Sequence, residues 1–114
     1  MGVLRGRKQN EFLPGTLDLL ILQTLSPGAM HGYGIAQLIR TRSEEVLHVG
    51  EGSLYPALQR LQVKGYVTAE WRQSETGRRA RYYRLSRQGR RQLEVERASY
   101  SRVSEAIARI LQPA

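Results

Sequence analysis

Apolar residues recur along this chain with two different periods, and the change of period separates helical from extended segments. The first periodic stretch follows a Pro-Gly-Thr turn at 14–16 and ends before a Ser-Pro-Gly turn at 26–28. We therefore expect a first helix between them, with Asp18 near the positive end of its dipole. Its buried face consists of Leu13, Leu17, Leu20, Ile21 and Leu25.

A second and a third helix follow, and the third has two contrasting faces. The spacing of Ile35, Leu38 and Ile39 predicts a helix over about 32–42, and the short segment 44–49 is expected to hold a brief strand. The third helix is expected to reach about Lys64, with Pro56 in its first turn, where a missing N–H is tolerated. Its inner stripe is Leu54, Ala57, Leu58 and Leu61, and its outer face carries Ser53, Tyr55, Pro56, Gln59 and Arg60.

The period then changes to two, which is typical of strands. Val67, Ala69 and Trp71 alternate with more polar neighbours, a turn is expected at 74–77, and 80–85 returns as a second strand. Ser86 is a candidate N-cap for a last helix that runs to about 112. One seam of that helix is apolar apart from Glu96, and it consists of Leu93, Tyr100, Val103, Ile107 and Ile110.

The order of the elements is helix, helix, short strand, helix, strand, strand, helix. This order predicts a mainly α fold with a small β-hairpin (α+β), namely a winged helix-turn-helix in which the hairpin is the wing. We divide the chain into a flexible basic arm at 1–12, a winged helix-turn-helix domain at 13–86 and a C-terminal helix at 87–114.

The positive charge is concentrated on the hairpin and on the start of the last helix. Lysine and arginine outnumber acidic residues 18 to 10 in the 114 residues, which gives a net charge of +8. Between Arg72 and Arg91 stand eight arginines and one acid, Glu75, and this block accounts for seven of the eight charges. Such a patch indicates an anionic partner, and a basic hairpin beside a helix suits double-stranded DNA.

Other function classes find little support in the sequence. The longest apolar run, at 19–22, is far too short to span a bilayer, and the N-terminus lacks the apolar stretch of a secretory signal. There is no cysteine, and neither His31 nor His48 has a second ligand at metal-binding spacing. No catalytic constellation is present. We expect a cytoplasmic protein that is not an enzyme and uses no metal or cofactor.

Several motifs, in the right order, resemble the PadR-like transcriptional regulators. The sequences LDLLIL at 17–22 and HGYGI at 31–35 resemble the opening of that family. So does EGSLYPALQRL at 51–61, with the Gly-Tyr pair at 65–66. The run GRRARYYRLS at 77–86, with Gly89, is similar to the family's wing and the start of its last helix. The resemblance covers roughly 13–93, and the motifs are specific only in combination.

The resemblance implies a homodimeric repressor in which the C-terminal helix pairs the subunits. The single helix at 87–114 is similar to the short-tailed branch of the family. The resemblance also suggests a small aromatic molecule as an effector, although no residue of the sequence locates a pocket for it.

The candidate DNA-binding residues lie on three predicted elements. A major groove admits a helix, so the outer face of the third helix is expected to contact bases, and the wing tip a flanking minor groove. Tyr33 is expected to place its hydroxyl and backbone N–H against phosphate. The full set is Tyr33, Ser53, Tyr55, Pro56, Gln59, Arg60, Lys64, Arg78, Arg79 and Arg81. The apolar seam of the last helix is the candidate dimer interface.

Each of these features also has a plainer interpretation. The helix face and the arginine run are solvated surfaces in many proteins, and the glycines beside Tyr33 also suit tight packing. Trp71 is expected to pack in a core or an interface. Arg87, Arg90 and Arg91 open the last helix, where cations oppose the dipole, so either a DNA phosphate or simple tolerance explains them.

Two other functions stay open on this sequence. One is an architectural or RNA-binding protein that uses charge without reading sequence. The other is an adaptor that binds proteins through the winged domain.

Overall fold

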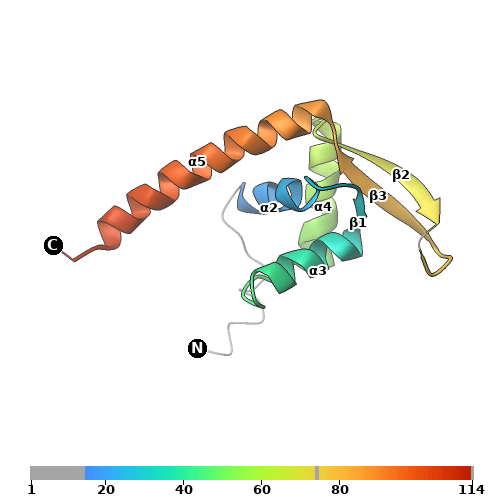
Figure 1. Ribbon diagram of the computed structural model, residues 1–114, viewed down its shortest axis with the longest axis horizontal. Coiled ribbons are helices and arrows are strands. Elements are labelled where there is room, and N and C mark those ends of the chain that lie inside the picture. The colour runs from blue at the N-terminus through green and yellow to red at the C-terminus, as the bar shows by residue number, and fades with distance from the viewer. Residues whose placement is uncertain (1–14, 74, 114) are drawn as a thin grey trace.

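A helical domain carries a projecting hairpin and a long C-terminal helix that extends away from both (Figure 1). This computed structural model describes residues 15–73 and 75–113. Within them the elements are α2 (Thr16–Thr24), β1 (Met30–His31), α3 (Gly32–Arg42), α4 (Glu51–Val63), β2 (Val67–Gln73), β3 (Arg79–Leu85) and α5 (Arg87–Leu111). The predicted mainly α fold with a β-hairpin wing is confirmed. The arm at 1–12 and Leu13 lie outside the described residues.

The strands form one antiparallel sheet in the order β1-β3-β2. The two residues of β1 pair with Tyr83 and Tyr82, so the sheet joins the start of α3 to the wing. In the hairpin, Val67 lies opposite Leu85 and Trp71 lies opposite Arg81. Alternate residues share a face of a strand, so these pairs belong to one surface, which we call the inner face of the wing.

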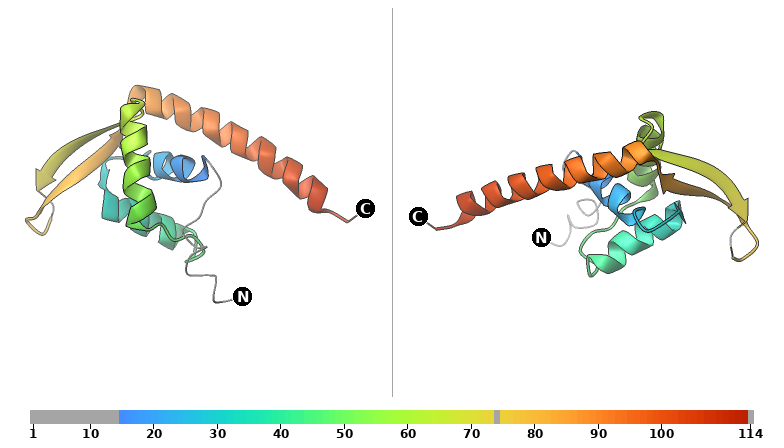
Figure 2. Two further views of the ribbon diagram at one scale, coloured as in Figure 1. Left: turned by 180° about the vertical axis from the view of Figure 1, so that it is seen from behind. Right: turned by 45° about the horizontal axis from the view of Figure 1, so that its top comes forward.

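The core lies where α2, α3, α4, the root of the wing and the start of α5 meet (Figure 2). It contains the inner stripe predicted for the third helix, together with Ile35 and Ile39 of the second. Leu20 and Leu38, also predicted to face inward, are only half-buried. The buried apolar side chains are Leu17, Ile21, Leu22, Leu25, Ile35, Ile39, Leu54, Ala57, Leu58, Leu61, Val67, Tyr83, Leu85 and Leu93.

The long helix α5 has a docked half and a free half (Figures 1 and 2). In the docked half, Leu93 is 5% exposed and packs in the domain core. Arg97 donates a hydrogen bond to Gln23 Oε1 of α2 at 2.7 Å. Leu93 therefore has almost no surface left for a partner chain, which separates it from the other residues of the predicted seam.

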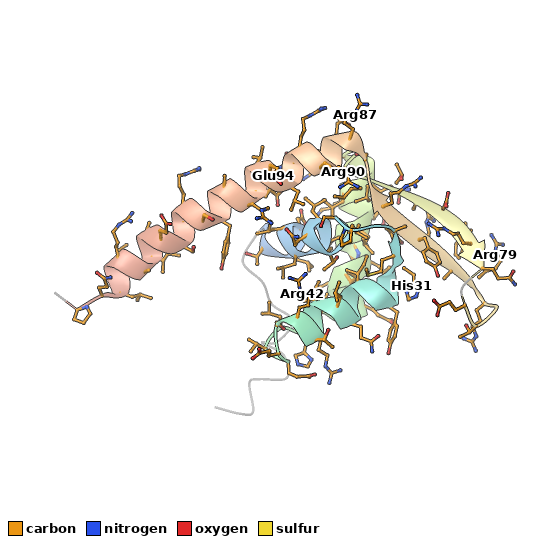
Figure 3. All side chains as sticks on the ribbon, in the orientation of Figure 1. His31, Arg42, Arg79, Arg87, Arg90 and Glu94 are labelled. Atoms are coloured by element: carbon orange, nitrogen blue, oxygen red, sulfur yellow. The ribbon has the colours of Figure 1, made fainter. Side chains whose placement is uncertain are left out.

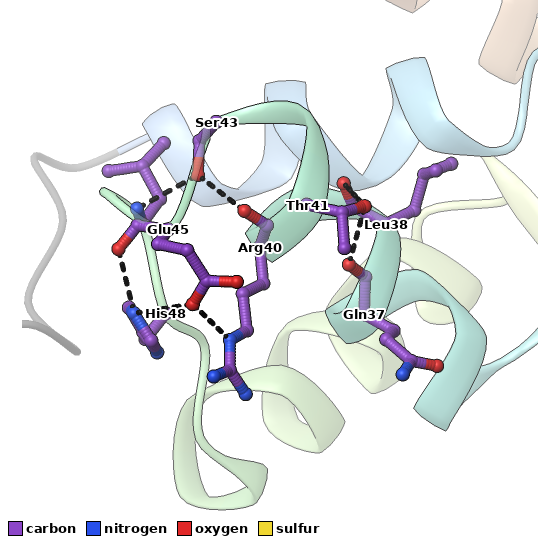
Figure 4. Close-up of polar contacts among 8 residues, drawn as sticks. Gln37, Leu38, Arg40, Thr41, Ser43, Glu45 and His48 are labelled. Carbon is purple, nitrogen blue, oxygen red and sulfur yellow. Dashed lines mark hydrogen bonds and ion pairs between the residues drawn. The ribbon is translucent and has the colours of Figure 1, made fainter.

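The brief strand expected at 44–49 is wrong. The segment is a turn followed by a loop, in which Glu44 and Glu45 have φ values of 55° and 71°. This left-handed backbone cannot continue a strand. Arg40 Nε lies 2.7 Å from Glu45 Oε1, and the His48 ring lies 2.8 Å from the Glu45 carbonyl oxygen (Figure 4). These contacts hold the reversal of the chain between α3 and α4.

Pro56 lies in the second turn of α4, not in the first turn as the sequence analysis expects. The helix begins at Glu51, and Pro56, five residues later, has no N–H to donate to the carbonyl of Gly52. A proline in a helix interior costs about 3 kcal/mol relative to alanine. The helix tolerates Pro56 because the residue projects from the exposed face while the opposite face is buried in the core.

The predicted N-cap of the last helix is confirmed, and it fixes the direction in which α5 leaves the wing. Ser86 Oγ accepts a hydrogen bond from the Gly89 N–H at 3.0 Å and donates one to the Gly65 carbonyl at 2.6 Å. Gly89 packs so closely on the Tyr66 carbonyl that no Cβ fits between them. Glycine at position 89 therefore permits the close approach of α5 to the backbone at Tyr66, just before β2.

Candidate nucleic-acid interface

Helix α4 presents the outer face that its periodicity predicts. Tyr55 is 41% exposed, and Ser53 is half-buried. The remaining candidates on this helix and at its end are exposed, namely Pro56, Gln59, Arg60 and Lys64. The buried stripe on the opposite side holds these side chains toward solvent at fixed positions.

The ring of Tyr55 lies over the start of α3. A Cβ on Gly32 would lie 2.6 Å from the Tyr55 hydroxyl oxygen and 2.9 Å from two ring carbons. Gly32 therefore leaves room for this ring, as the tight-packing interpretation of the glycine requires. The neighbouring Tyr33 is 68% exposed, so two tyrosines stand side by side where α3 and α4 meet.

Trp71 organises the inner face of the wing. It is 55% exposed, so of the two places expected for it, a core or an interface, the core is wrong and the interface stays a prediction. The guanidinium carbons of Arg79 and Arg81 lie 5.2 Å and 5.8 Å from the centroid of its ring, within cation–π range. Arg81 Nε is buried and has no hydrogen-bond partner among the described residues. The ring thus gathers two guanidinium groups on one side of the hairpin.

The wing and the helices border a common hollow of about 640 Å³. The walls combine aromatic rings with guanidinium groups, and one wall includes Trp71. The predicted DNA-binding residues that line it are Tyr33, Tyr55, Arg78, Arg79 and Arg81. A second hollow lies between α4 and the wing, and Tyr55, Gln59 and Arg81 line it.

Tyr83 links the two hollows to the core. It is buried, and it contributes to the lining of both. Burial raises the pKa of the Tyr83 phenol from its ordinary value of 10.0, against the lowering effect of Arg81, while Tyr55 adds to the rise. The phenol is therefore a neutral hydroxyl at physiological pH, so the positive charge of Arg81 beside it is not neutralised by a phenolate.

Arg60 stands apart from the wing side of α4. Its Nη2 donates a hydrogen bond to Asp18 Oδ1 of α2 at 3.1 Å, and the Asp18 side chain is only 13% exposed. Arg60, Pro56, Gln59 and Lys64 border a third, shallow hollow together with Val63. The candidate residues of α4 thus divide between a flank toward the wing and a flank toward α2.

The arginines at the start of α5 lie far from the wing tip. Figure 3 shows Arg87 and Arg90 near the first turn of α5 and Arg79 at the far end of the hairpin. Arg90 Nη1 donates a hydrogen bond to the Ser26 carbonyl at 3.3 Å. This contact explains Arg90 as a side chain that docks α5 on the end of α2, without recourse to a DNA phosphate.

In the part of the chain that the structure describes, no three histidine, cysteine or acidic side chains are grouped so that they could hold a metal ion. None of the helices in that part combines the length and the apolar character that crossing a membrane requires.

Three residues of this surface are absent from the predicted DNA-binding set. The sequence predicts a helix-dipole role for Asp18 and packing for Trp71, and it predicts no role for Val63. Helical periodicity already places Val63 opposite the buried stripe of α4, so that signal was present in the sequence. The pairing of Asp18 with Arg60 joins residues 42 positions apart and had no local signal.

The three helices α2, α3 and α4, followed by the hairpin, define a winged helix-turn-helix protein. The model of the transcriptional regulator PadR-like family matches residues 21–95. The chain therefore belongs to the PadR-like family, whose members are DNA-binding transcriptional regulators.

Relatives and solved structures support this assignment. A transcriptional regulator from Clostridium thermocellum has a TM-score of 0.79 at 27% identity, covering 98% of this chain and 100% of that one. A PadR family regulator from Clostridium difficile has a TM-score of 0.74 at 31% identity, covering 86% of this chain and 100% of its own. The transcriptional regulator YqjI of Escherichia coli is 32% identical over 102 residues, which cover 90% of this chain and 47% of YqjI. This chain thus spans about half the length of YqjI.

The ion pair between Asp18 and Arg60 generates a prediction. If α4 contacts DNA as the sequence predicts, Asp18→Asn removes a carboxylate that would compete with DNA phosphate for the Arg60 guanidinium. Arg60 is 54% exposed, and an ion pair that solvent reaches from one side is worth up to about 1 kcal/mol, so the affinity for a random duplex should rise by up to about fivefold. Fluorescence anisotropy at fixed salt measures the change.

Glu70→Gln is the matched control for this experiment. It removes the same charge from a pair with Arg72, whose Nε lies 3.0 Å from the Glu70 carboxylate on the other face of the wing. Equal gains for both variants would mean that only net charge matters and that Arg60 has no special access to DNA.

Proposed function

We propose that this protein is a sequence-specific repressor that binds a palindromic operator as a homodimer. Each copy would place α4 in a major groove and its wing in the flanking minor groove. The observation that carries the proposal is that Tyr55 of α4 and Arg81 of the wing line the same two hollows. The helix and the wing therefore form one cationic surface that suits a continuous stretch of duplex.

The proposed contacts differ by element. Gln59 and Arg60 would meet base edges in the major groove, and Tyr33 would meet phosphate. Ser53 and Tyr55 would meet phosphate or a thymine methyl. Pro56 offers an apolar contact, and Lys64 a backbone contact at the end of the helix. On the wing, Arg78 and Arg79 reach the minor groove, and Arg81 lies between the wing and the helix.

The free half of α5 supports the homodimer. Tyr100, Val103, Ile107 and Ile110 recur at helical spacing and are 46–80% exposed in the single chain. An apolar stripe of this length on a projecting helix indicates a protein contact, and a second copy supplies the same stripe. Leu111, 76% exposed, extends the stripe by one residue beyond the predicted seam.

Selection of bound sequences from a random duplex pool tests the function. A palindromic consensus is expected, and unrelated duplex should compete at least about a thousandfold less well than the selected site. A pool that stays random, with competition by any duplex, would instead support the architectural alternative. Binding that does not respond to salt would point to the adaptor.

The wing generates a second prediction. Arg78→Ala together with Arg79→Ala should flatten the log–log dependence of affinity on salt by roughly 1–2 units per subunit. The reason is that binding releases fewer counterions from the DNA when fewer phosphates are contacted. The control replaces two exposed arginines of α5, Arg102→Ala and Arg109→Ala, which removes the same charge at a distance from the proposed DNA-binding surface. The salt slope of this control should stay close to that of wild type. An unmoved slope in the wing variant, with unchanged thermal stability, would make those arginines a solvated face.

The dimer generates a third prediction. Ile107→Glu places a charge in the proposed apolar interface and should give monomers in sedimentation, with much weaker operator binding. Ala98→Glu adds the same group on the opposite face of α5 and should remain dimeric. If Ile107→Glu sediments as the wild type does, the free half of α5 is not the dimer element.

A further inference from the structure

The line of α4 that lies farthest from the core is apolar. At 100° per residue, Pro56 and Val63 fall within about 30° of the direction opposite the buried leucines of the helix. Val63 is 81% exposed, and Pro56 is exposed as well. We call these two residues the outer ridge of α4.

Polar side chains flank the outer ridge on both sides. Arg60 lies on the side of α2, where it pairs with Asp18. Gln59 lies on the side of the wing and lines a hollow with Arg81. The shallow hollow along the ridge includes Lys64 at its C-terminal end. A DNA duplex held by Arg60, Lys64 and Arg81 would meet the ridge first.

The stability of the fold does not account for the ridge. Pro56 weakens α4, and a β-branched residue such as Val63 is a poorer helix former than alanine. Neither residue belongs to the hydrophobic core. A single exposed valine is ordinary on a protein surface. A valine aligned with a proline, between an arginine on one flank and a glutamine on the other, matches apolar groups on an anionic partner that also offers hydrogen-bonding groups.

The apolar group that a major groove offers is the C5-methyl of thymine. Seven residues of helix span about 10.5 Å, which corresponds to about three base-pair steps. Gln59, between the two ridge residues, has the amide that pairs with the N6 and N7 positions of adenine.

We propose that Val63 is a specificity-determining residue that contacts a thymine methyl, and that Pro56 contacts a second one about three base pairs away. The proposal rests on the proposed placement of α4 in the major groove. The two contacts predict the kind of operator that the protein binds, in which each half-site has thymines about three base pairs apart and an adenine between them.

Replacement of thymine by deoxyuridine tests the proposal, because it removes the methyl and leaves base pairing intact. In the duplex selected from the random pool, each thymine is replaced in turn, and the affinity of the full-length protein is measured by anisotropy. Loss of one methyl contact should weaken binding roughly fourfold at two positions about three base pairs apart in each half-site, and hardly at others.

Variants then assign each methyl to a residue. Val63→Ala should bind the thymine and uracil forms of one position equally and keep the discrimination at the other, and Pro56→Ala should do the reverse. Val63→Thr, which keeps the shape of the side chain, should lose part of the discrimination. Val95→Ala is the matched control, since Val95 is 60% exposed on α5, and it should discriminate as wild type does. Val63→Ala should unfold at the temperature of wild type or slightly above it, because alanine is the better helix former and Val63 is outside the core.

Three results overturn the proposal, and they are distinguishable. Specific binding that ignores uracil at every position would refute the methyl contacts and leave the proposed function intact. Uracil sensitivity that persists in Val63→Ala would assign the contact to another side chain. A pool that yields no consensus would refute the proposed function and this inference together.

Discussion

The surface of this protein depends on the burial of one stripe of α4. Leu54, Leu58 and Leu61 are at most 2% exposed, and each buried leucine stabilises the fold by about 1.5–3 kcal/mol. Together they outweigh the cost of about 3 kcal/mol that Pro56 imposes on the same helix. The core thus fixes the rotation of α4 about its axis. That rotation decides which side chains face solvent, so the outer face can carry residues that weaken a helix.

In the wing, as in α4, buried residues at one end fix which side chains face solvent. Its inner face begins in the core with Val67 and Leu85 and ends in solvent with Trp71 and the arginines. The hairpin carries five arginines, Arg72, Arg78, Arg79, Arg81 and Arg84, whose like charges repel each other. An aromatic ring with cations over its face is one arrangement that tolerates them. Arg72 makes a similar contact on the other face, where its guanidinium lies 4.4 Å from the Tyr82 ring centroid. The hairpin therefore supports its charge with its own aromatic residues.

Periodicity predicted most of the fold because it reports which face of an element is buried. It could not predict β1, whose two residues are a strand only through pairing with β3 some 50 positions later. It misplaced a strand at 44–49 because the left-handed backbone of Glu44 and Glu45 leaves no mark in a hydrophobic pattern. Periodicity also predicted only part of the candidate site. Exposure follows from periodicity, whereas the partners of Arg60 and Arg90 come from α2 and its end, 42 and 64 positions away.

The continuity of α5 ties the wing to the proposed dimer. The helix starts at Arg87, with Ser86 as its N-cap directly after β3, and it is held to α2 by Leu93 and Arg97 before its apolar stripe becomes exposed. No flexible linker separates the docked half from the free half, because α5 is one unbroken helix from Arg87 to Leu111. A second copy paired along the free half would therefore stand at a fixed distance and angle from the first. The spacing between two copies of α4, and hence between operator half-sites, would follow from the packing of Leu93 and Arg97 as much as from the dimer contact itself.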